Sequence, residues 1–551
     1  LLGVTAALSV CRYSFKGKDA LLNYYTSPMY VPSVAFAFVL LQVYSQIGGV
    51  SGMLRIFIGH LIIILPYIVR NTVSVLHVFN WTLEDAATSM GATPIQVFFK
   101  ITIPLARPGI MAGALLAFTM SFDDFVISYF VTGQGVKNLS IMVYTMSKRI
   151  NPSVNAISTL VVLLITITLT IVNILPIIRK KTSPSKQNKP WKWAVAGVVV
   201  VGLVASLFGL NKSAGSQPYA GQTLHVYNWG EYTGENIISG FEELTGAKVI
   251  MDNFDSNEQM YIKVANGDAY DVLVPSDYMI QRMMQEKMLQ KLEPETRKEC
   301  LGELVDAIKG LPYDPKNEYS IPYFWGTVGI VYDKRKVSEE DLEKDGWDIF
   351  LDQKFKGDIY LYDSERDSFM MALKALGYSM NTTSQDELNA AYNWLIQCVQ
   401  TMDPEIVTDE IIDNMAQARK ALGVIYSGDA AYVMSENENM GFYMPKSGTN
   451  LWSDAMVIPK NAKNPKLANE FIRYITSYDA AMDNSSYVGY TSPNKEVMEE
   501  LGGKGGDYDG INAYTPRAGY DKDEVFQYDE TTRKIIADLW SRVKVSASNA
   551  H

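Results

Sequence analysis

Residues 179–210 read RKKTSPSKQNKPWKWAVAGVVVVGLVASLFGL and divide the chain into two parts of different composition. The stretch opens with a cluster of basic residues and closes with an apolar run of about 18 residues, from Trp193 to Leu210. A basic flank before such a run predicts a membrane-spanning helix that starts on the cytoplasmic side. The residues after this helix are therefore expected outside the cell, tethered to the part that precedes it.

The net charge of −11 over 551 residues averages two unlike halves. Before residue 179 acidic residues are few and apolar runs are long, whereas from Gln222 onward Asp and Glu are frequent and Tyr and Trp recur. An acidic outer half favours a cationic ligand over nucleic acid, although an ordinary solvated surface would carry the same charge. We expect no metal site and no cofactor, because the histidines form no ligand cluster: His60, His77, His225 and His551.

The first half contains a series of apolar runs, each near the roughly 20 residues of a spanning helix. They occupy 1–13 (in part), 27–46, 54–78, 108–132, 156–178 and 193–210. Basic residues place the polar segment 80–107 and the linker 179–192 on the cytoplasmic side, and the two spans between them agree with this assignment. Lys148 and Arg149 then fall outside, against the usual trend, so the number of spans decides the orientation.

The polar segment contains LEDAATSMGATPIQVFFKITIPLARPG at 83–109. The small side chains of Ala86 and Ala87 let another surface approach the helix closely. Gly91 tolerates the left-handed conformation that ends a helix, and Pro104 sets the return to the membrane. The pattern predicts a short helix that docks on a partner. An amphipathic connector without a partner is the alternative.

This loop resembles the coupling loop of the permease subunits of ABC importers, whose signature is Glu-Ala-Ala, three residues, Gly and then Ile-x-Leu-Pro. Asp85 replaces the Glu and Ile103 replaces the Leu, and the spacing is intact. The resemblance implies a type I permease over 1–178 that lacks its N-terminal part, a second permease subunit, and two ATP-hydrolysing subunits that receive the loop. The coupling residues that it implies are Asp85, Ala86, Ala87, Gly91 and Pro104.

Two adjacent acids, Asp123 and Asp124, interrupt the run 108–132. We expect them mid-helix, where one charge at the bilayer centre costs about 2.5–3.5 kcal/mol and must face a cavity or a partner. A path for a cationic substrate would explain the pair, and polyamine permeases carry a similar one. Alternatively, the pair lies near the membrane surface or binds a basic residue.

The second half alternates strands and helices: strands at 223–227, 247–252 and 270–274, and a helix at 236–245. This order predicts parallel α/β layers, and about 330 residues suit two lobes. Ligands of such sheets bind beyond the carboxyl ends of the strands, which directs attention to 228–232 and 275–278.

Aromatic residues beside polar groups, most of them carboxylates, recur in this half, at 228–232, 362–367, 426–429, 451–454 and 526–528. An aromatic wall with a few carboxylates suits an organic ammonium ion, because a cation–π contact gives about 0.5–2 kcal/mol and a charge-assisted hydrogen bond about 1.5–3 kcal/mol. Taken singly, an aromatic residue belongs more often to the core or to the surface than to a ligand site, but the recurrence beside acids after strand ends favours a ligand site.

Four motifs resemble the spermidine/putrescine-binding proteins of ABC importers: NWGEY at 228–232, VPSDY at 274–278, IPYFWG at 321–326 and GYTSPN at 489–494. The likeness runs through nearly all of 222–545. It implies that Asp454 faces an amino end of the ligand and that Trp452 packs on the methylene chain. The ligand residues that it implies are Trp229, Gly230, Tyr232, Ser276, Tyr278, Asp367, Tyr426, Asp429, Trp452, Asp454, Tyr490 and Gln527.

Three positions, two of them among these ligand residues, bear on the choice of ligand. Ser364 stands where spermidine binders tend to have a carboxylate, whereas Asp367 keeps the second one and Asp429 matches putrescine-preferring relatives. The sequence thus leaves spermidine and putrescine open. It also leaves open whether Cys300 and Cys398 pair.

The fold class we predict is an all-α membrane domain joined to an α/β two-lobed domain like the periplasmic binding proteins. The segments are a permease domain at 1–178, a cytoplasmic linker at 179–192, an anchor helix at 193–210, an outer linker at 211–221 and a binding domain at 222–551. Its first lobe covers about 222–326 and 455–498, and its second about 327–454 and 499–545. The expected function is polyamine uptake at the plasma membrane, with no enzyme activity in this chain. A carrier of another small organic cation and a non-transporting sensor are the alternatives.

Overall fold

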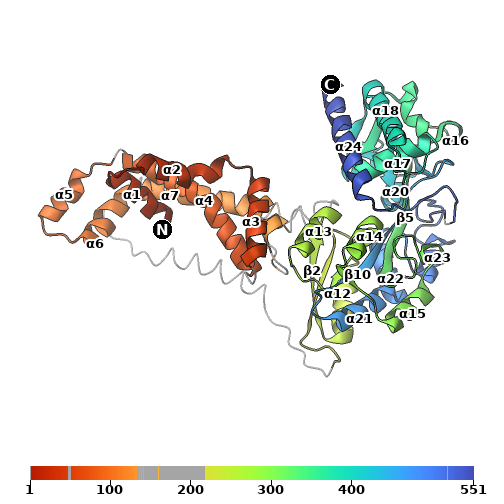
Figure 1. Cartoon of the computed structure of the whole chain (residues 1–551), viewed down its shortest axis with the longest axis horizontal. Helices are drawn as coiled ribbons and strands as arrows, with labels where there is room; N and C mark the ends of the chain where they lie inside the picture. Colours follow the sequence, from red (N-terminus) through yellow and green to blue (C-terminus); the bar gives the residue numbers. More distant parts are fainter. Residues whose placement is uncertain are drawn as a thin grey trace, which may run out of the picture.

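The computed structural model describes residues 2–47, 51–77, 79–132, 136, 138, 140–141, 159, 217–517 and 519–550. These residues form a helical N-terminal region and an α/β domain of two lobes, which lie side by side in Figure 1. The predicted fold class is confirmed.

The N-terminal region consists of α1 (Leu2–Arg12), α2 (Lys18–Thr26), α3 (Ser33–Ile47), α4 (Gly52–His77), α5 (Thr82–Ser89), α6 (Pro94–Val97), a π-helical turn (Phe98–Thr102), α7 (Ile103–Asp123) and α8 (Val126–Val131). By length and composition, two helical stretches of the described residues can cross a membrane, namely Gly52–His77 and Pro94–Asp123. A third span results if Lys18–Tyr30 and Ser33–Tyr44, bent by 104°, count as one. The runs 156–178 and 193–210 lie outside the described residues, except for residue 159.

The prediction that Asp123 and Asp124 lie mid-helix is wrong, because α7 ends at Asp123 and Asp124 has an extended backbone. The side chain of Asp124 accepts hydrogen bonds from the backbone N–H groups of Ile127 and Ser128, at 3.3 and 2.9 Å. It therefore caps α8, and the competition between this cap and the helix ladder explains the break in the run 108–132.

The predicted docking helix is α5, and the chain leaves it through Gly91, whose φ is +86°. Thr93 and Gln96 form a capping box that starts α6, and Pro104 lies in the first turn of α7. Glu84, rather than Asp85, is buried in this loop, where it contacts Thr102 and Arg12. The segment 82–102 is thus a helical hairpin tied back to α1 and to the start of α7.

The strands of the first lobe lie in the order β2-β1-β3-β10-β5. Strands β1, β2 and β3 are parallel, and β10 is antiparallel to both β3 and β5. The strands are β1 (Thr223–Trp229), β2 (Lys248–Phe254), β3 (Val272–Leu273), β4 (Leu289–Gln290, paired with β10), β5 (Ser320–Asp333) and β10 (Leu451–Pro459). The helices are α12 (Ile237–Thr245), α13 (Asn257–Ala265), α14 (Asp277–Gln285), α15 (Pro294–Glu303), α21 (Pro465–Thr476), α22 (Tyr478–Val488) and α23 (Lys495–Gly502).

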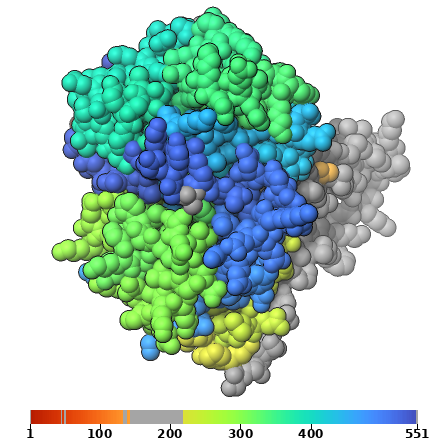
Figure 2. All heavy atoms as spheres, turned by 90° about the vertical axis from the view of Figure 1, so that its right-hand side faces the viewer, coloured from red at the N-terminus to blue at the C-terminus, as the bar shows by residue number. Residues whose placement is uncertain are grey.

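The second lobe continues the sheet as β5-β8-β6-β7, with β9 paired to β5. Its strands are β6 (Ile359–Tyr362), β7 (Glu405–Val407), β8 (Leu422–Tyr426) and β9 (Met440–Tyr443). Its helices are α16 (Glu339–Asp345), α17 (Glu365–Ala375), α18 (Gln385–Thr401), α19 (Glu410–Ala416), α20 (Ser427–Glu436) and α24 (Glu530–Ala550). In Figure 2 the two lobes lie one above the other, with C-terminal segments in blue across their boundary.

Three chain segments cross between the lobes beside one another. Val328 on β5 donates its N–H to the carbonyl of Asn450 at 3.2 Å, and the Thr449 hydroxyl donates to the carbonyl of Val328 at 2.6 Å. The N–H of Glu524 donates to the carbonyl of Thr449 at 3.0 Å, which adds the third segment. Because only backbone ladders and short loops join the lobes here, this crossing is the natural hinge.

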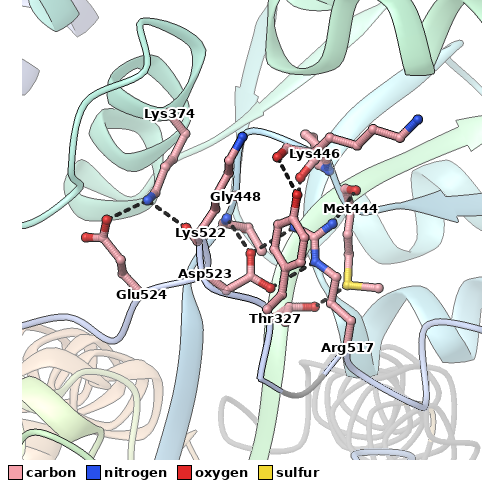
Figure 3. A network of polar contacts seen from close by, with 12 residues as sticks. Thr327, Lys374, Met444, Lys446, Gly448, Arg517, Lys522, Asp523 and Glu524 are labelled. Carbon is pink, nitrogen blue, oxygen red and sulfur yellow. Dashed lines mark hydrogen bonds and ion pairs between the residues drawn. The ribbon is translucent and has the colours of Figure 1, made fainter.

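Two cations bind the third crossing segment to the second lobe (Figure 3). Arg517 forms a bidentate pair with Asp523 and also donates to the carbonyls of Met444 and Pro445. The buried ammonium of Lys374 donates to the carbonyl of Lys522 at 2.8 Å and to the Glu524 carboxylate at 2.7 Å. These contacts fix the path of the crossing segment.

Replacing Lys374 by Ala is expected to lower the free energy of unfolding of the binding domain by about 2–3 kcal/mol. The Lys522 carbonyl loses the ammonium, and the Glu524 carboxylate keeps only its hydrogen bonds from Ser379 and Asn381. Lys336→Ala removes an exposed pair with Asp358 and is the matched control, with an expected loss below about 1 kcal/mol. Urea denaturation followed by tryptophan fluorescence measures both. Equal losses of stability in the two variants would show that Lys374 does not hold the third crossing segment.

All three cysteines are free thiols, and Cys300 and Cys398 do not pair. Cys300 lies buried on α15 in the first lobe and Cys398 lies buried on α18 in the second. Burial raises their pKa values, to about 11 for Cys300 and about 12 for Cys398. Both are therefore protonated, inert parts of the core.

Candidate functional site

A cleft of about 480 Å³ lies between the two lobes, a size that suits a small organic ligand. Nine carboxylates and one guanidinium, that of Arg366, line it, so the cleft favours a cation. The carboxylates belong to Glu231, Asp255, Glu258, Asp277, Asp363, Asp367, Asp409, Asp429 and Asp454.

The structure brings the predicted ligand residues together in this cleft, with one exception. Gln527 does not line the cleft: its side chain is exposed, and its neighbour Phe526 takes the lining position. The residues that do line it are Trp229, Gly230, Tyr232, Ser276, Tyr278, Asp367, Tyr426, Asp429, Trp452, Asp454 and Tyr490.

The cleft forms where strands end and helices begin, as expected for open α/β sheets. Trp229 is the last residue of β1, and Tyr426 is the last residue of β8. Asp277, Asp367 and Asp429 each lie in the first turn of a helix, α14, α17 and α20 respectively. Helix N-termini stabilise negative charge, so this arrangement supports the carboxylates in the cleft.

Four tyrosines along the cleft each donate a hydrogen bond to a different carboxylate. The pairs are Tyr232–Asp454 at 2.8 Å, Tyr426–Asp367 at 2.7 Å, Tyr490–Asp429 at 2.9 Å and Tyr362–Asp409 at 3.0 Å. A tyrosine hydroxyl orients the carboxylate that accepts from it and leaves further lone pairs for a ligand. The cleft therefore presents several oriented anionic acceptors rather than one.

The same tyrosines and Trp452 form a continuous aromatic wall. The ring of Trp452 lies 5.6 Å from that of Tyr490 and 6.1 Å from that of Tyr426. Tyr232 extends the wall beyond Tyr490 at 5.3 Å, and Tyr362 extends it beyond Tyr426 at 5.1 Å. Methylene groups pack on such faces, and an ammonium ion is attracted to them.

Asp454 and Asp277 lie at the floor of the cleft, where 8% and 1% of their surfaces are exposed. Burial raises the pKa of Asp454 to about 6, although hydrogen bonds from Ser276 and Tyr232 oppose the shift. Burial likewise raises the pKa of Asp277 to about 7, opposed by its hydrogen bond from the N–H of Tyr278. A cation at this floor would restore the ionised form of both carboxyls.

Cation affinity is therefore expected to rise with pH. Below about pH 6 the empty site holds protons on Asp454 and Asp277, and a cation must displace them; above about pH 7 both carboxyls are ionised. We expect about tenfold weaker binding at pH 5 than at pH 8, with proton release during binding between these limits. Calorimetry in two buffers of different ionisation enthalpy measures the released protons. A flat profile would contradict this account.

Arg366 occupies one end of the cleft as an internal cation. Its guanidinium lies 3.3 Å from the centroid of the Tyr278 ring and 4.0 Å from the carboxylate of Glu258. The Tyr278 hydroxyl also donates to Glu258, at 3.1 Å. Tyr278 thus lines the cleft as predicted, but Arg366 covers a face of its ring.

The sequence analysis did not predict several of the residues that line the cleft. Asp255 and Glu258 follow β2, and Asp409 follows β7, so the strand-end rule would have found them had it been applied to these strands. No sequence signal identifies Asn450, which joins the site because it crosses the hinge and donates to Asp367 at 3.4 Å.

In the helical region, Asp124 also pairs with His60. The imidazole Nε2 lies 3.1 Å from Asp124 and 2.8 Å from the Ser128 hydroxyl, and Nδ1 lies 2.8 Å from Ser121. The structure thus supplies a basic partner for one member of the acidic pair.

Comparison with known proteins agrees with this architecture. Residues 236–504 match the family of bacterial extracellular solute-binding proteins, and residues 1–180 match the binding-protein-dependent transport system inner membrane component. The spermidine/putrescine-binding periplasmic protein of Escherichia coli (strain K12) is 34% identical over 281 residues, which are 51% of this chain and 80% of that protein. The putrescine-binding periplasmic protein PotF of the same organism is 28% identical over 324 residues, 56% of this chain and 85% of that protein.

Two solved structures also resemble the binding domain. The spermidine/putrescine ABC transporter substrate-binding protein PotD from Streptococcus pneumoniae is 34% identical, with a TM-score of 0.53, and the match covers 59% of this chain and 99% of that one. A spermidine/putrescine ABC transporter protein from Listeria monocytogenes is 36% identical, with a TM-score of 0.52 and coverage of 59% and 99%. The chain therefore belongs to the bacterial extracellular solute-binding proteins, in the branch that contains the spermidine/putrescine-binding proteins, and carries this domain fused to an inner membrane component of binding-protein-dependent transport.

Proposed function

We propose that this chain is a subunit of an ABC importer for polyamines, in which one polypeptide contains both a permease and its binding protein. The binding domain closes its two lobes on spermidine or putrescine and releases the ligand to the permease half. The observation that carries this proposal is the row of tyrosine–carboxylate pairs along one aromatic wall, because it offers acceptors for more than one ammonium group and faces for the methylenes between them.

This geometry supports the following position for each group of the ligand. One ammonium group binds Asp454 at the floor, next to Tyr232, and the methylene chain packs on Trp452. The other end of the ligand lies towards Asp367 and Asp429 on the second lobe, so a ligand bound to both sides favours closure. Contacts of this strength at two ends, with the methylenes between rings, reach the roughly 8 kcal/mol of micromolar binding.

The domain layout that we propose is a permease at 1–178, a cytoplasmic linker at 179–192, an anchor helix at 193–210, an outer linker at 211–221 and an extracellular binding domain at 222–551. The permease half would pair with a second permease subunit and with two ATPase subunits. In this arrangement α5 and the turn at Gly91 receive the motion of an ATPase, and Asp123 and Asp124 contact the cation on its path.

The test is uptake of labelled putrescine and spermidine by membrane vesicles that contain the whole transporter. ATP-dependent accumulation that excess unlabelled polyamine abolishes is expected, with no accumulation of labelled leucine. Polyamine binding without any accumulation would support a sensor instead, and accumulation of a different organic cation alone would replace the proposed substrate.

A further inference from the structure

The first lobe contacts the helical region through a set of charged and aromatic residues outside the cleft floor. Arg55, near the start of α4, directs Nη1 at the Asp268 carboxylate, at 3.3 Å. Only 15% of the Arg55 side chain and 9% of the Asp268 side chain are exposed. This ion pair is therefore largely removed from water, and loss of either partner leaves a buried charge.

A second contact lies beside the first. Tyr129 on α8 donates its hydroxyl hydrogen to Asp255, and the side-chain amide of Gln259 lies against the same hydroxyl. The ammonium of Lys263 on α13 lies 5.6 Å from the centroid of the Tyr129 ring and 5.7 Å from that of Tyr227. The Lys263 ammonium thus lies near two aromatic rings, that of Tyr129 from the helical region and that of Tyr227 from the first lobe.

The charges on this surface are complementary to those of the helical region that covers it. Lys263 is 5% exposed, and burial lowers its pKa although Asp268, Asp252 and Asp255 oppose the shift. Burial raises the pKa of Asp268, and the nearby Arg55 guanidinium opposes it most strongly. Arg55 from the helical region therefore supplies the charge that this acidic surface of the first lobe requires.

These contacts all come from residues 255–268, which we call the docking surface. It consists of the two residues between β2 and α13, of α13 itself and of the turn after α13. In Figure 1 α13 and β2 lie next to the helical region, whereas α17 and α18 of the second lobe lie well away from it. An attachment of this kind holds the first lobe and leaves the second lobe to move about the hinge.

Asp255 belongs both to the docking surface and to the lining of the cleft. The rim of the cleft is therefore placed against α8, whose N-terminus is capped by Asp124. A ligand that leaves the cleft at this rim would enter the helical region beside Asp123 and Asp124.

We propose that residues 255–268 form the docking surface for the extracellular ends of α4 and α8 of the same chain, so that the first lobe stays fixed on its own permease half while the second lobe opens and closes. The hand-over at the rim rests on the proposed function, but the docking itself does not.

Cross-linking tests the docking without any transport. The full-length chain in membranes, with Arg55→Cys and Asp268→Cys together, is treated with a short bismaleimide. A cross-link within one chain, seen as a mobility shift without a dimer band, is expected. Arg55→Cys with Lys336→Cys, at an exposed position of the second lobe, is the matched control and should not cross-link. A dimer band, or equal yields in the two pairs, would overturn the proposal.

A charge exchange tests the ion pair itself. Arg55→Asp or Asp268→Arg alone should lower polyamine uptake at least about tenfold, as expected when one partner of a buried pair is lost, while the affinity of the isolated binding domain with Asp268→Arg stays the same. The double variant should recover most of the uptake. Single variants with full uptake, or a double variant no better than the singles, would contradict the docking. If the unaltered chain imports no polyamine, the proposed function fails, and the cross-link still decides the docking.

Discussion

Binding of putrescine and spermidine is expected to weaken at least tenfold when Asn replaces Asp454. The substitution keeps the shape of the side chain and its contact with the Tyr232 hydroxyl but removes the negative charge at the cleft floor. A charge-assisted hydrogen bond contributes about 1.5–3 kcal/mol, which corresponds to a factor of about 10 to 150 in the dissociation constant. Titration calorimetry of the binding domain measures this change.

The control variant is Asp363→Asn. Asp363 also lines the cleft, but its carboxylate already accepts from the Trp540 indole at 3.0 Å and pairs with Lys544 at 3.1 Å. We expect a change of less than about threefold, because the positive charge of Lys544 already offsets this carboxylate. Thermal unfolding adds a second check: Asp454→Asn removes a charge whose burial is unfavourable, so the empty domain should not become less stable. An Asp454→Asn domain with unchanged affinity would remove this residue from the site.

Gly428→Ala is expected to abolish tight polyamine binding through the aromatic wall. A Cβ atom at residue 428 would lie 1.6 Å from Cδ1 of the Tyr490 ring, so the ring must leave its place. Its movement breaks the hydrogen bond to Asp429 and the contacts with Trp452 and Tyr232. The combined loss of about 2–4 kcal/mol predicts at least about thirtyfold weaker binding.

The matched control is Gly302→Ala on α15, where an added Cβ meets nothing within 4 Å. Helix propensity predicts that this change leaves binding unaltered and stabilises the domain slightly. The affinities of the two glycine variants separate crowding of the ligand wall from a general effect of added methyl groups. Similar affinities for both variants would show that Tyr490 is not part of the binding surface.

The sequence predicted the elements whose pattern is local. The strand at 223–227 is β1, the helix at 236–245 is α12, and the residues after β1 and β3 line the cleft as the strand-end rule requires. These predictions succeeded because alternation and helix periodicity are set by neighbouring residues.

Other features depend on contacts between distant residues, and the sequence did not reveal them. The helix break at Asp124 reflects a cap on α8 together with a partner, His60, that lies far away in the chain. Arg366 covers Tyr278 only because the lobes face each other. Gln527 was placed by resemblance alone, and the adjacent Phe526 takes its position because the path of the third crossing segment is fixed at Asp523 and Glu524.

Calorimetry on residues 215–551 with putrescine, spermidine, an amino acid and maltose decides whether the cleft binds a polyamine. We expect saturable heat with one or both polyamines at micromolar dissociation constants, and none with the neutral or zwitterionic compounds. No heat with either polyamine at pH 8, where the carboxyls at the cleft floor are ionised, would contradict polyamine binding by the cleft.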